Sequence, residues 1–445
     1  VVTDRTARPL GGHTTERSDG GRGFDVAYFD STDWSGPVVG TATTRDGRIL
    51  HFDRAPGVTD LRSFSFRATT TFTPVVDGDH ALTLVQAGRA RLLVDGHVVV
   101  DGIERPMPPG EEFFAMGSAE AEAMVTMVAG RPTDVTVEWT SEGARFLGGV
   151  KVGVGTPSPD DLMDRAVAAA AAADAVVLVV GTNLEWETEG RDRESMDLPG
   201  GQPELIRRVC AANGRTVVVV NSGSVVTSDW AEVAPAVLQT WFGGQEMADA
   251  LVDVLVGDDE PSGRLPTTMP HRLEDTPAFL SYPGENGRVV YSEGLFTGYR
   301  WYEARRLPVA FPFGHGLGYT SFTWGEPVLG GVPSISELEA GTGVTVTVPV
   351  TNNGDRAGSE VVQCYVAPVS PRLTRPVREL QGFAKVRLEP GATADVVVVL
   401  DHRAFAYWDP ADPGHSERSS GVPVAAGRGS GPREEPGWHV DPGTY

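Results

Sequence analysis

The chain has 445 residues and a net charge of −23, and 40% of its residues are hydrophobic. This length predicts about two to four globular domains, and the hydrophobic content excludes a disordered chain. The acidic balance argues against nucleic acid and anionic membranes as partners, because those surfaces bind clustered lysine and arginine. Lys151 and Lys385 are the only lysines, a bias that is typical of bacteria with GC-rich genomes.

The sequence contains no membrane-spanning pattern. Its longest apolar run, residues 166–180, includes Asp174 and is too short to cross a bilayer. The opening residues, VVTDRTARPLGG, contain neither a methionine nor a signal-peptide pattern. We therefore expect a soluble protein, with extracellular and cytoplasmic locations both open.

The first third of the chain has the pattern of β-strands. Residues 1–22 are polar and glycine-rich and are interpreted as a linker. The segment HALTLVQAGRARLLVDGHVVVDG alternates between apolar and polar residues and turns at Asp95-Gly96, which is a strong hairpin signal. We expect a β-sandwich over residues 23–156.

A different pattern starts at Ser158, which is placed to cap a helix and is followed by a proline. Continuous apolar segments follow at residues 175–180 and 216–221, separated by a helical pattern at 202–212. Strands without alternation are typical of a parallel sheet that is buried on both faces. Residues 157–325 are therefore expected to form an α/β sandwich domain.

The last part of the chain returns to β-strand patterns. Residues 326–340 are interpreted as a second linker, and segments such as GVTVTVPVTNNGD predict another β-sandwich over residues 341–445. Residues 410–436 are rich in glycine, proline and charge and are expected to be disordered. The last turn should lead to one more strand, so we expect this sandwich to be incomplete. The fold class is α/β plus all-β: an α/β sandwich domain flanked by two β-sandwich domains.

The loop after the first apolar strand of the α/β region is rich in ionisable residues and reads GTNLEWETEGRDRESMDLPGG. Ligands of open parallel sheets bind beyond the carboxyl ends of the strands, where this loop is expected to lie. Trp186, Asp192 and Arg193 are its candidate substrate-binding residues. The alternative is a solvated charged loop in which Trp186 packs against the protein.

A second candidate is the segment VVYSEGLFTGYRWYE, residues 289–303, which places Glu293 beside a glycine and among aromatic side chains. An acid in such a position is a candidate for a chemical role. The alternative is that Glu293 forms an ion pair with Arg288 or Arg300.

Other kinds of site have no pattern in this sequence. The nine histidines are scattered, and neither C-x-x-C nor H-E-x-x-H occurs, so no metal is expected. The sequence also lacks a G-x-S-x-G elbow and the glycine-rich nucleotide motifs. We therefore expect no cofactor.

Four segments resemble the C-terminal domain of family 3 glycoside hydrolases, typified by β-glucosidases. In chain order they are ETEGRDRESMDLPGGQPELIRRV, AVLQTWFGGQEMADALVDVLVGDDEPSGRLPTTMP, VVYSEGLFTGYRWYE and FPFGHGLGYTSFTW. The segment TFTPVVDGDHALTLVQAGRARLLVDGHVVVDG resembles the protective-antigen-type β-sandwich module that some members carry. Residues 341–445 resemble the fibronectin type III-like domain that ends many members.

The resemblance implies a retaining mechanism with two carboxylates. One is an Asp nucleophile on an N-terminal TIM barrel, and the other is a Glu acid/base in an E-G/D-x-x-x-G-Y-R segment, which by that match is Glu293. The implied substrate is a β-glucoside with either a small-molecule or an oligosaccharide aglycone. A homo-oligomer is compatible with the resemblance.

The sequence departs from the family in two respects. No part of it has the repeated βα pattern of a TIM barrel, and the first βα unit of the family's α/β domain is missing as well. Asp229 lies in an S-D-W triplet like the family's nucleophile motif, but its context is an ordinary stretch of the α/β domain. We therefore expect the C-terminal part of a retaining exo-β-glucosidase, inactive without its barrel. Two alternatives stay open: a non-catalytic carbohydrate-binding or adhesion protein, and a family relative that cleaves N-acetylglucosamine.

Overall fold

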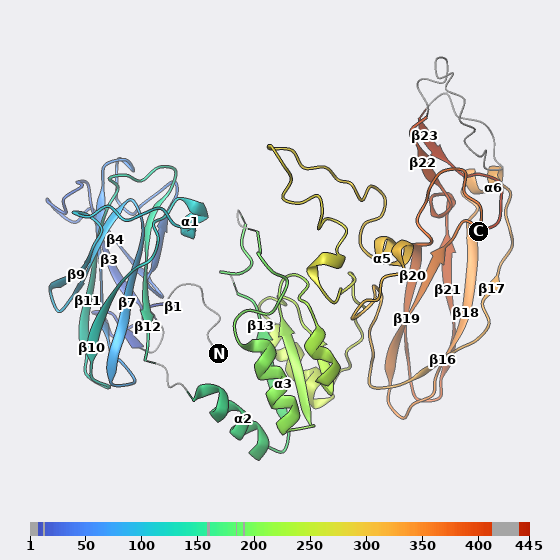
Figure 1. The fold of residues 1–445 in the computed structure, drawn as a ribbon, viewed down its shortest axis with the longest axis horizontal. Coiled ribbons are helices and arrows are strands. Elements are labelled where there is room, and N and C mark those ends of the chain that lie inside the picture. The colour runs from blue at the N-terminus through green and yellow to red at the C-terminus, as the bar shows by residue number, and fades with distance from the viewer. Residues whose placement is uncertain (1–7, 12–13, 158–160, 184, 190–191, 412–435) are drawn as a thin grey trace. The chain divides into compact units, whose positions relative to one another are not determined.

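The computed structural model describes residues 8–11, 14–157, 161–183, 185–189, 192–411 and 436–445. The chain divides into two compact units, whose helices and strands are drawn in Figure 1. The first comprises Val1–Glu194, Leu198–Ser224 and Val233–Gln239, and the second comprises Ser195–Asp197, Val225–Glu232 and Thr240–Tyr445.

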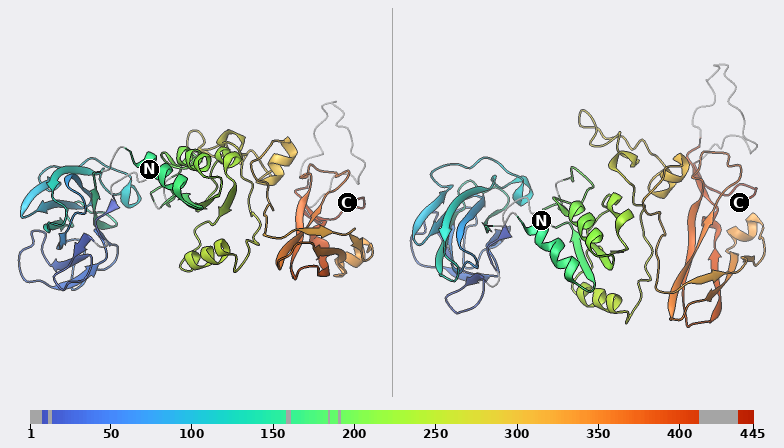
Figure 2. Two further views of the ribbon diagram at one scale, coloured as in Figure 1. Left: turned by 90° about the horizontal axis from the view of Figure 1, so that it is seen from below. Right: turned by 60° about the horizontal axis from the view of Figure 1, so that its bottom comes forward.

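The first unit begins with an N-terminal β domain made of two largely antiparallel sheets. The seven-stranded sheet has the order β4 (Gly40–Thr44), β3 (Phe24–Phe29), β6 (Ser65–Phe72), β11 (Thr133–Thr140), β8 (Arg89–Val94) and β9 (His97–Asp101), with β2 (Thr15–Glu16) also paired to β6. The five-stranded sheet has the order β1 (Arg8–Pro9), β12 (Gly148–Gly155), β7 (Gly78–Ala87) and β10 (Ala121–Met127), with β5 (Arg48–His51) also paired to β12. Figure 2 shows these strands from two further directions.

Side chains from both sheets form one hydrophobic core. Its largest member is Trp139 on β11, which is fully buried. The Trp139 ring stacks on Phe66 with 5.0 Å between ring centroids, and its indole N–H donates to the Ala87 carbonyl oxygen at 2.9 Å. The core therefore joins the two sheets through packing and a satisfied polar group.

The predicted hairpin at Asp95-Gly96 is confirmed. Val94 of β8 pairs with His97 of β9, and the two turn residues have φ angles of 47° and 78°. Positive φ at both central positions is what a tight two-residue turn requires, and Asp-Gly supplies it at low cost.

The predicted linker over residues 1–22 is partly wrong. Strand β1 pairs with β12, β2 pairs with β6, and Leu10 is fully buried in the core. Strands of two residues are too short to show alternation, so the sequence pattern did not reveal them. Sheet edges formed by other parts of the chain order these residues.

The first unit also contains a parallel sheet of three strands: β13 (Val176–Gly181), β14 (Thr216–Asn221) and β15 (Ala236–Gln239). Helices α2 (Leu162–Ala172) and α3 (Gln202–Ala212) pack against each other, and α3 contacts β14 (Figure 1). The predicted helix cap, Ser158, lies outside the described residues. The remaining elements match the α/β pattern expected from the sequence.

The expectation that every strand of this sheet is buried on both faces is wrong for β13. Its side chains alternate, and Val177 and Val179 are 52% and 60% exposed. Strand β14 lies between two partners and does bury the side chains of Val218, Val219 and Val220. Strand β13 is an edge strand among the described residues, so a continuous apolar sequence was not sufficient evidence for burial on both faces.

The second unit contains helices α4 (Met247–Val256) and α5 (Tyr299–Arg305), followed by a C-terminal β region. Its four-stranded sheet has the order β16 (Phe322–Trp324), β18 (Val344–Asn352) and β17 (Val328–Leu329), with β21 (Thr393–Leu400) also paired to β18. Two further pairs are β19 (Gly358–Val366) with β20 (Glu379–Leu388), and β22 (Tyr407–Asp409) with β23 (Gly437–His439). Strands β18, β19, β20 and β21 contribute to one core cluster.

The predicted second linker, residues 326–340, contains β17 and helix α6 (Ile335–Glu339). Ser334 and Glu337 form a reciprocal capping box at the start of α6, which explains this short helix locally. The stretch predicted to be disordered, residues 410–436, lies largely outside the described residues. Among the described helices, none is long and apolar enough to cross a membrane.

Candidate active site

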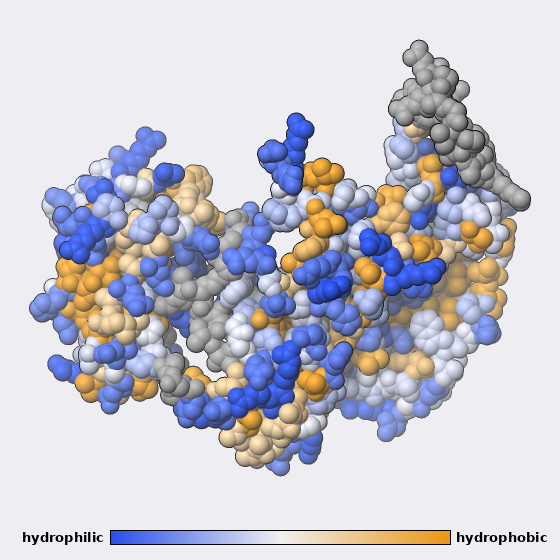
Figure 3. Space-filling view, viewed as in Figure 1, coloured by the Kyte–Doolittle hydropathy of each residue, from blue (hydrophilic) through white to orange (hydrophobic). Residues whose placement is uncertain are grey.

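The segment that carries Glu293 belongs to the second unit and has neither helix nor strand between residue 279 and the start of α5. It turns at an isolated antiparallel bridge between Glu285 and Arg288. Seven of its apolar side chains are exposed: Phe279, Leu280, Tyr282, Val289, Val290, Tyr291 and Leu295. Hydrophobic residues lie behind the hydrophilic tip of this segment in the space-filling view (Figure 3). Exposed apolar surface of this extent is typical of an interaction site.

Glu293 is half-buried, and its Oε2 atom is buried without a hydrogen-bond partner among the described residues. The chain turns immediately after it, because Gly294 has a φ angle of 55° and the Phe296 N–H donates to the Glu293 carbonyl oxygen at 2.9 Å. Buried polar atoms in proteins are nearly always hydrogen-bonded. The open carboxyl oxygen is therefore an exception of the kind that functional sites show.

The alternative that Glu293 is merely an ion-pair partner gains no support. Arg300 instead lies 3.4 Å from Glu379 and places its guanidinium over the ring of Tyr299. Arg288 is exposed and its main chain bonds to Glu285. Over the described part of the chain, no arginine lies within ion-pair distance of the Glu293 carboxylate.

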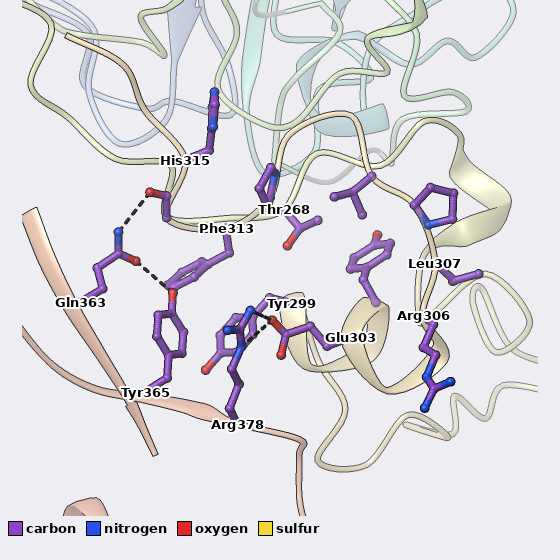
Figure 4. A pocket seen from close by; sticks show the side chains of 15 residues that line it. Thr268, Tyr299, Glu303, Arg306, Leu307, Phe313, His315, Gln363, Tyr365 and Arg378 are labelled. Carbon is purple, nitrogen blue, oxygen red and sulfur yellow. Dashed lines mark hydrogen bonds and ion pairs between the residues drawn. The ribbon is translucent and has the colours of Figure 1, made fainter. Parts of the chain in front are cut away.

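A pocket of about 720 Å³ lies beside helix α5, between it and strand β19 (Figure 4). Its lining includes Thr268, Tyr299, Tyr302, Glu303, Arg306, Leu307, Phe313, His315, Gln363, Tyr365 and Arg378. The Tyr299 and Phe313 rings stack with centroids 4.7 Å apart and form one wall. This volume and aromatic lining are typical of a small-molecule site.

Charged and polar groups in this pocket are largely paired with each other. Arg378 donates to Glu303 Oε1 through Nε at 2.9 Å and Nη2 at 2.6 Å, as Figure 4 shows. This hydrogen bond to Glu303 raises the pKa of Arg378 above its usual value. Burial, with the nearby Asp275 charge, raises the pKa of Tyr302 to about 12. Sequence reasoning missed this pocket because Glu303 and Arg378 are distant in sequence and no local motif links them.

The charged loop of residues 181–201, which we call the ligand-edge loop, starts at the end of β13. Its first residue must be a glycine because of the backbone conformation and the close approach of β14. Gly181 has a φ angle of 152°, and a Cβ atom there would lie 1.8 Å from the Asn221 carbonyl oxygen of β14. The buried Gln202 side chain holds the same residue, because it accepts from the Gly181 N–H at 2.7 Å and donates to the Gly181 carbonyl at 2.8 Å. The two hydrogen bonds from Gln202 thereby hold the carboxyl end of β13, from which the loop departs.

The three predicted loop residues lie in the first unit, whereas Glu293 lies in the second. Trp186 is half-buried, and its N–H donates to the Asn183 carbonyl in a turn. Arg193 donates to Ser224 Oγ at 2.8 Å and lies 3.7 Å from Glu187. Asp192 is exposed. Arg193 and Glu187 are therefore not simply solvated. They lie within ion-pair distance of each other, and each also has a hydrogen bond, Arg193 to Ser224 and Glu187 from the Thr182 hydroxyl.

Asp229 lies at the start of a short 3-10 helix, Asp229–Val233, and is exposed. The flanking residues of its S-D-W triplet are buried: Ser228 Oγ donates to the Val226 carbonyl, and the Trp230 indole donates to the Thr227 carbonyl. Two buried side chains of the triplet are therefore held by hydrogen bonds to carbonyl groups of the same local segment. Among the residues that the structure describes, no group of acidic, His or Cys side chains has the spacing of a metal site.

Two family models match the sequence. The model of the glycosyl hydrolase family 3 C-terminal domain matches residues 78–319, and the model of a fibronectin type III-like domain matches residues 360–421. The first of these covers more than half of the chain.

Individual relatives agree with the family models. A β-glucosidase of Rhizobium radiobacter is 44% identical over 392 residues, which are 86% of this chain and 47% of that protein. A probable β-glucosidase I of Emericella nidulans is 37% identical over 421 residues, which are 90% of this chain and 49% of that protein. The solved β-glucosidase of Kluyveromyces marxianus in complex with glucose superposes with a TM-score of 0.84 at 33% identity, over 91% of this chain and 49% of that one. The chain thus spans about half the length of the relatives it matches.

Proposed function

Because the chain belongs to glycosyl hydrolase family 3, through that family's C-terminal domain, we propose that it is the C-terminal part of a retaining exo-β-glucosidase in which Glu293 is the general acid/base. The substrate is a glycoside with a terminal β-D-glucosyl residue, carried on an oligosaccharide or a natural-product aglycone. The observation that carries the proposal is the buried Glu293 Oε2 atom, which has no partner among the described residues although it lies in the family's motif.

The chemistry assigns Glu293 two steps. As a neutral acid it donates its proton to the glycosidic oxygen while an Asp nucleophile forms the glycosyl-enzyme, and as a carboxylate it then takes a proton from the attacking water. A carboxyl oxygen without a hydrogen-bond donor is available to hold and release that proton. An arginine partner would instead stabilise the ionised form and disfavour the first step.

The nucleophile belongs, in this proposal, to a TIM barrel outside these 445 residues. Parallel strand pairing in the described parts of the chain is limited to β13, β14 and β15, which is far from an eight-stranded barrel. The exposed apolar side chains around Glu293 supply a surface on which a further domain would dock. The chain without that domain is expected to be inactive.

The remaining assignments follow the same proposal. The N-terminal β domain is a protective-antigen-type module, and together with the ligand-edge loop it lines the aglycone side of the cleft. Trp186 stacks on the aglycone, while Asp192 and Arg193 contribute polar contacts.

The test compares Glu293→Gln with Glu285→Gln in the complete enzyme, since Glu285 is an exposed acid of the same segment. We expect Glu293→Gln to lower kcat/KM by about 10²–10⁴-fold for aryl β-glucosides with poor leaving groups, the usual range for a lost general acid. For leaving groups that need no protonation, the same variant should lose much less kcat/KM, because the first step no longer depends on the acid. Azide should restore turnover, because it attacks the glycosyl-enzyme in place of activated water. Glu285→Gln should match the parent.

Equal losses for good and poor leaving groups, or no loss at all, would refute the acid/base assignment. The location of the nucleophile is tested separately with the purified 445-residue chain. Turnover of an aryl β-glucoside by this chain, abolished by Glu293→Gln, would contradict the external barrel and leave the acid/base role intact. Sugar binding without turnover by the complete enzyme would favour the non-catalytic carbohydrate-binding alternative.

A further inference from the structure

Lys151 is a buried cation in a chain that has only two lysines. Its side chain is 2% exposed, although it lies on the face of β12 that points away from the main core. Val150 and Val152, its neighbours on the strand, point into that core. A lysine on the outer face of an antiparallel sheet normally reaches water. Something must therefore cover Lys151 and compensate for its desolvation.

Two carboxylates hold the Lys151 ammonium. Its Nζ atom lies 3.1 Å from Glu112 Oε1 and 2.7 Å from Glu185 Oε1. Arg48, directly opposite Lys151 in the pairing of β5 with β12, lies 3.5 Å from the other oxygen of Glu112. We call these four residues the Lys151 cluster; it contains two cations and two anions, so its charges balance.

The partners of Lys151 come from different parts of the fold. Glu112 belongs to the short helix α1 (Glu112–Ala115) of the N-terminal β domain, whereas Glu185 belongs to the ligand-edge loop after β13. All of them lie within the first compact unit. The buried ammonium thus links a strand of the β domain to the loop at the carboxyl end of the parallel sheet.

Glu185 sits in a tight turn together with Trp186. The Glu185 N–H donates to Asn183 Oδ1 at 2.9 Å, and the N–H groups of Trp186 and Glu187 both donate to the Asn183 carbonyl at 3.0 Å. Glu187 is in turn fixed by Thr182, whose hydroxyl donates to it at 2.7 Å. Fixing the Glu185 carboxylate therefore also fixes the turn that presents Trp186.

We propose that Lys151 is a positioning residue, whose ammonium clamps the Glu185 turn of the ligand-edge loop to the N-terminal β domain and so determines which aglycones the loop admits. The clamp follows from the geometry of the cluster alone, whereas its effect on aglycones rests on the proposed function. A surface ion pair would have little effect on the loop, but removing one member of a buried ion cluster leaves the remaining charges less well compensated, which favours the open loop.

The clamp is tested by lysine reactivity on the 445-residue chain. Lys385 is exposed and serves as an internal standard for labelling with an amine-reactive acetylating reagent, followed by mass spectrometry. We expect Lys385 to react and Lys151 to be protected in the parent chain. In Glu185→Gln, labelling of Lys151 should accelerate by about tenfold or more, because reactivity follows the population of the opened loop. Glu189→Gln, which changes an exposed acid of the same loop, is the control and should leave Lys151 protected.

The functional consequence is tested in the complete enzyme with Lys151→Met and Lys151→Arg, compared over glucosides with small and extended aglycones. We expect Lys151→Met to raise KM for extended aglycones by about tenfold while kcat for a small aryl glucoside stays within about twofold, and Lys151→Arg to restore part of the loss. Parallel changes for every aglycone would show a general structural role and overturn the specificity claim. Equal labelling of Lys151 and Lys385 in the parent would overturn the clamp itself. Absence of glucosidase activity in the complete enzyme would refute the proposed function, while the labelling result would still decide the clamp.

Discussion

The substitution Gly181→Ala tests the geometry at the start of the ligand-edge loop. Gly181 is the last residue of β13 and pairs with Asn221 of β14. Its φ angle of 152° lies in a region that favours glycine, and a Cβ atom would lie 1.8 Å from the Asn221 carbonyl oxygen and 2.6 Å from the carbonyl carbon. Both clashing atoms belong to the main chain, so no side-chain rotation can relieve the overlap.

The magnitude follows from two contributions. A non-glycine residue in such a backbone conformation costs about 1–3 kcal/mol, and forced separation of packed atoms costs about 1–3 kcal/mol. The separation also strains the two hydrogen bonds between Gly181 and the Gln202 side chain. We therefore expect Gly181→Ala to lower the free energy of unfolding of the parallel sheet by about 2–5 kcal/mol.

The assay is hydrogen exchange of the amides of β13 and β14, supported by urea unfolding. A loss of 2 kcal/mol corresponds to exchange that is about 30-fold faster, and the N-terminal β domain should keep its parent rates. Gly214→Ala is the matched control, because no atom lies within 4 Å of a Cβ built there. That control should change stability by less than about 1 kcal/mol. Parent-like exchange in Gly181→Ala, or equal losses in both variants, would refute the steric argument.

Three further predictions concern other parts of the chain. Burial and the Asp275 charge raise the pKa of Tyr302 from 10.0 to about 12, so the stability contributed by its neutral form is present below pH 10 and is lost as the pH rises from 10 to 12. Tyr302→Phe should remove one late step from the tyrosinate absorbance titration, and an unchanged titration curve would contradict this. Trp139→Ala should lower the free energy of unfolding of the N-terminal β domain by about 3–5 kcal/mol, measured in urea, because the ring is fully buried; a loss below about 1 kcal/mol would contradict the packing. Glu138→Gln should lower the free energy of unfolding of the same domain by about 1–2 kcal/mol, because Glu138 accepts from both Arg67 and Arg91 at 2.6 Å. The loss should be smaller at high salt, because both arginines stay partly exposed. A loss that salt does not reduce would argue against an ionic contribution.

Local sequence information was sufficient to predict an element of secondary structure wherever the residues that specify the element are close together in the chain. The helix expected at residues 202–212 matches α3, and the strand expected at residues 216–221 matches β14, because periodicity and the flanking turn residues specify them. The Asp95-Gly96 hairpin follows from two residues that accept positive φ. The motif around Glu293 likewise directed attention to a carboxyl group that has a buried oxygen without a hydrogen-bond partner among the described residues, a property that it shares with Glu303.

Long-range packing decided which residues of these elements are buried and which are exposed. Leu10 lies in a segment that has the composition of a linker, yet it is buried because two sheets assembled from other residues cover it. The exposed face of β13 depends on which strands and helices adjoin it, and an apolar sequence cannot report that.

By itself, then, the sequence determined the local elements, the family motif and the candidate acid Glu293, because these depend on short-range periodicity, turn chemistry and residue identity. Only the tertiary structure showed that Lys151 lies between Glu112 and Glu185, and that Glu303 pairs with Arg378 beside an aromatic pocket. The physical reason is that an ion pair or a pocket requires residues from distant parts of the chain at distances of a few ångströms. Such distances are set by how the elements pack, and no local pattern encodes them.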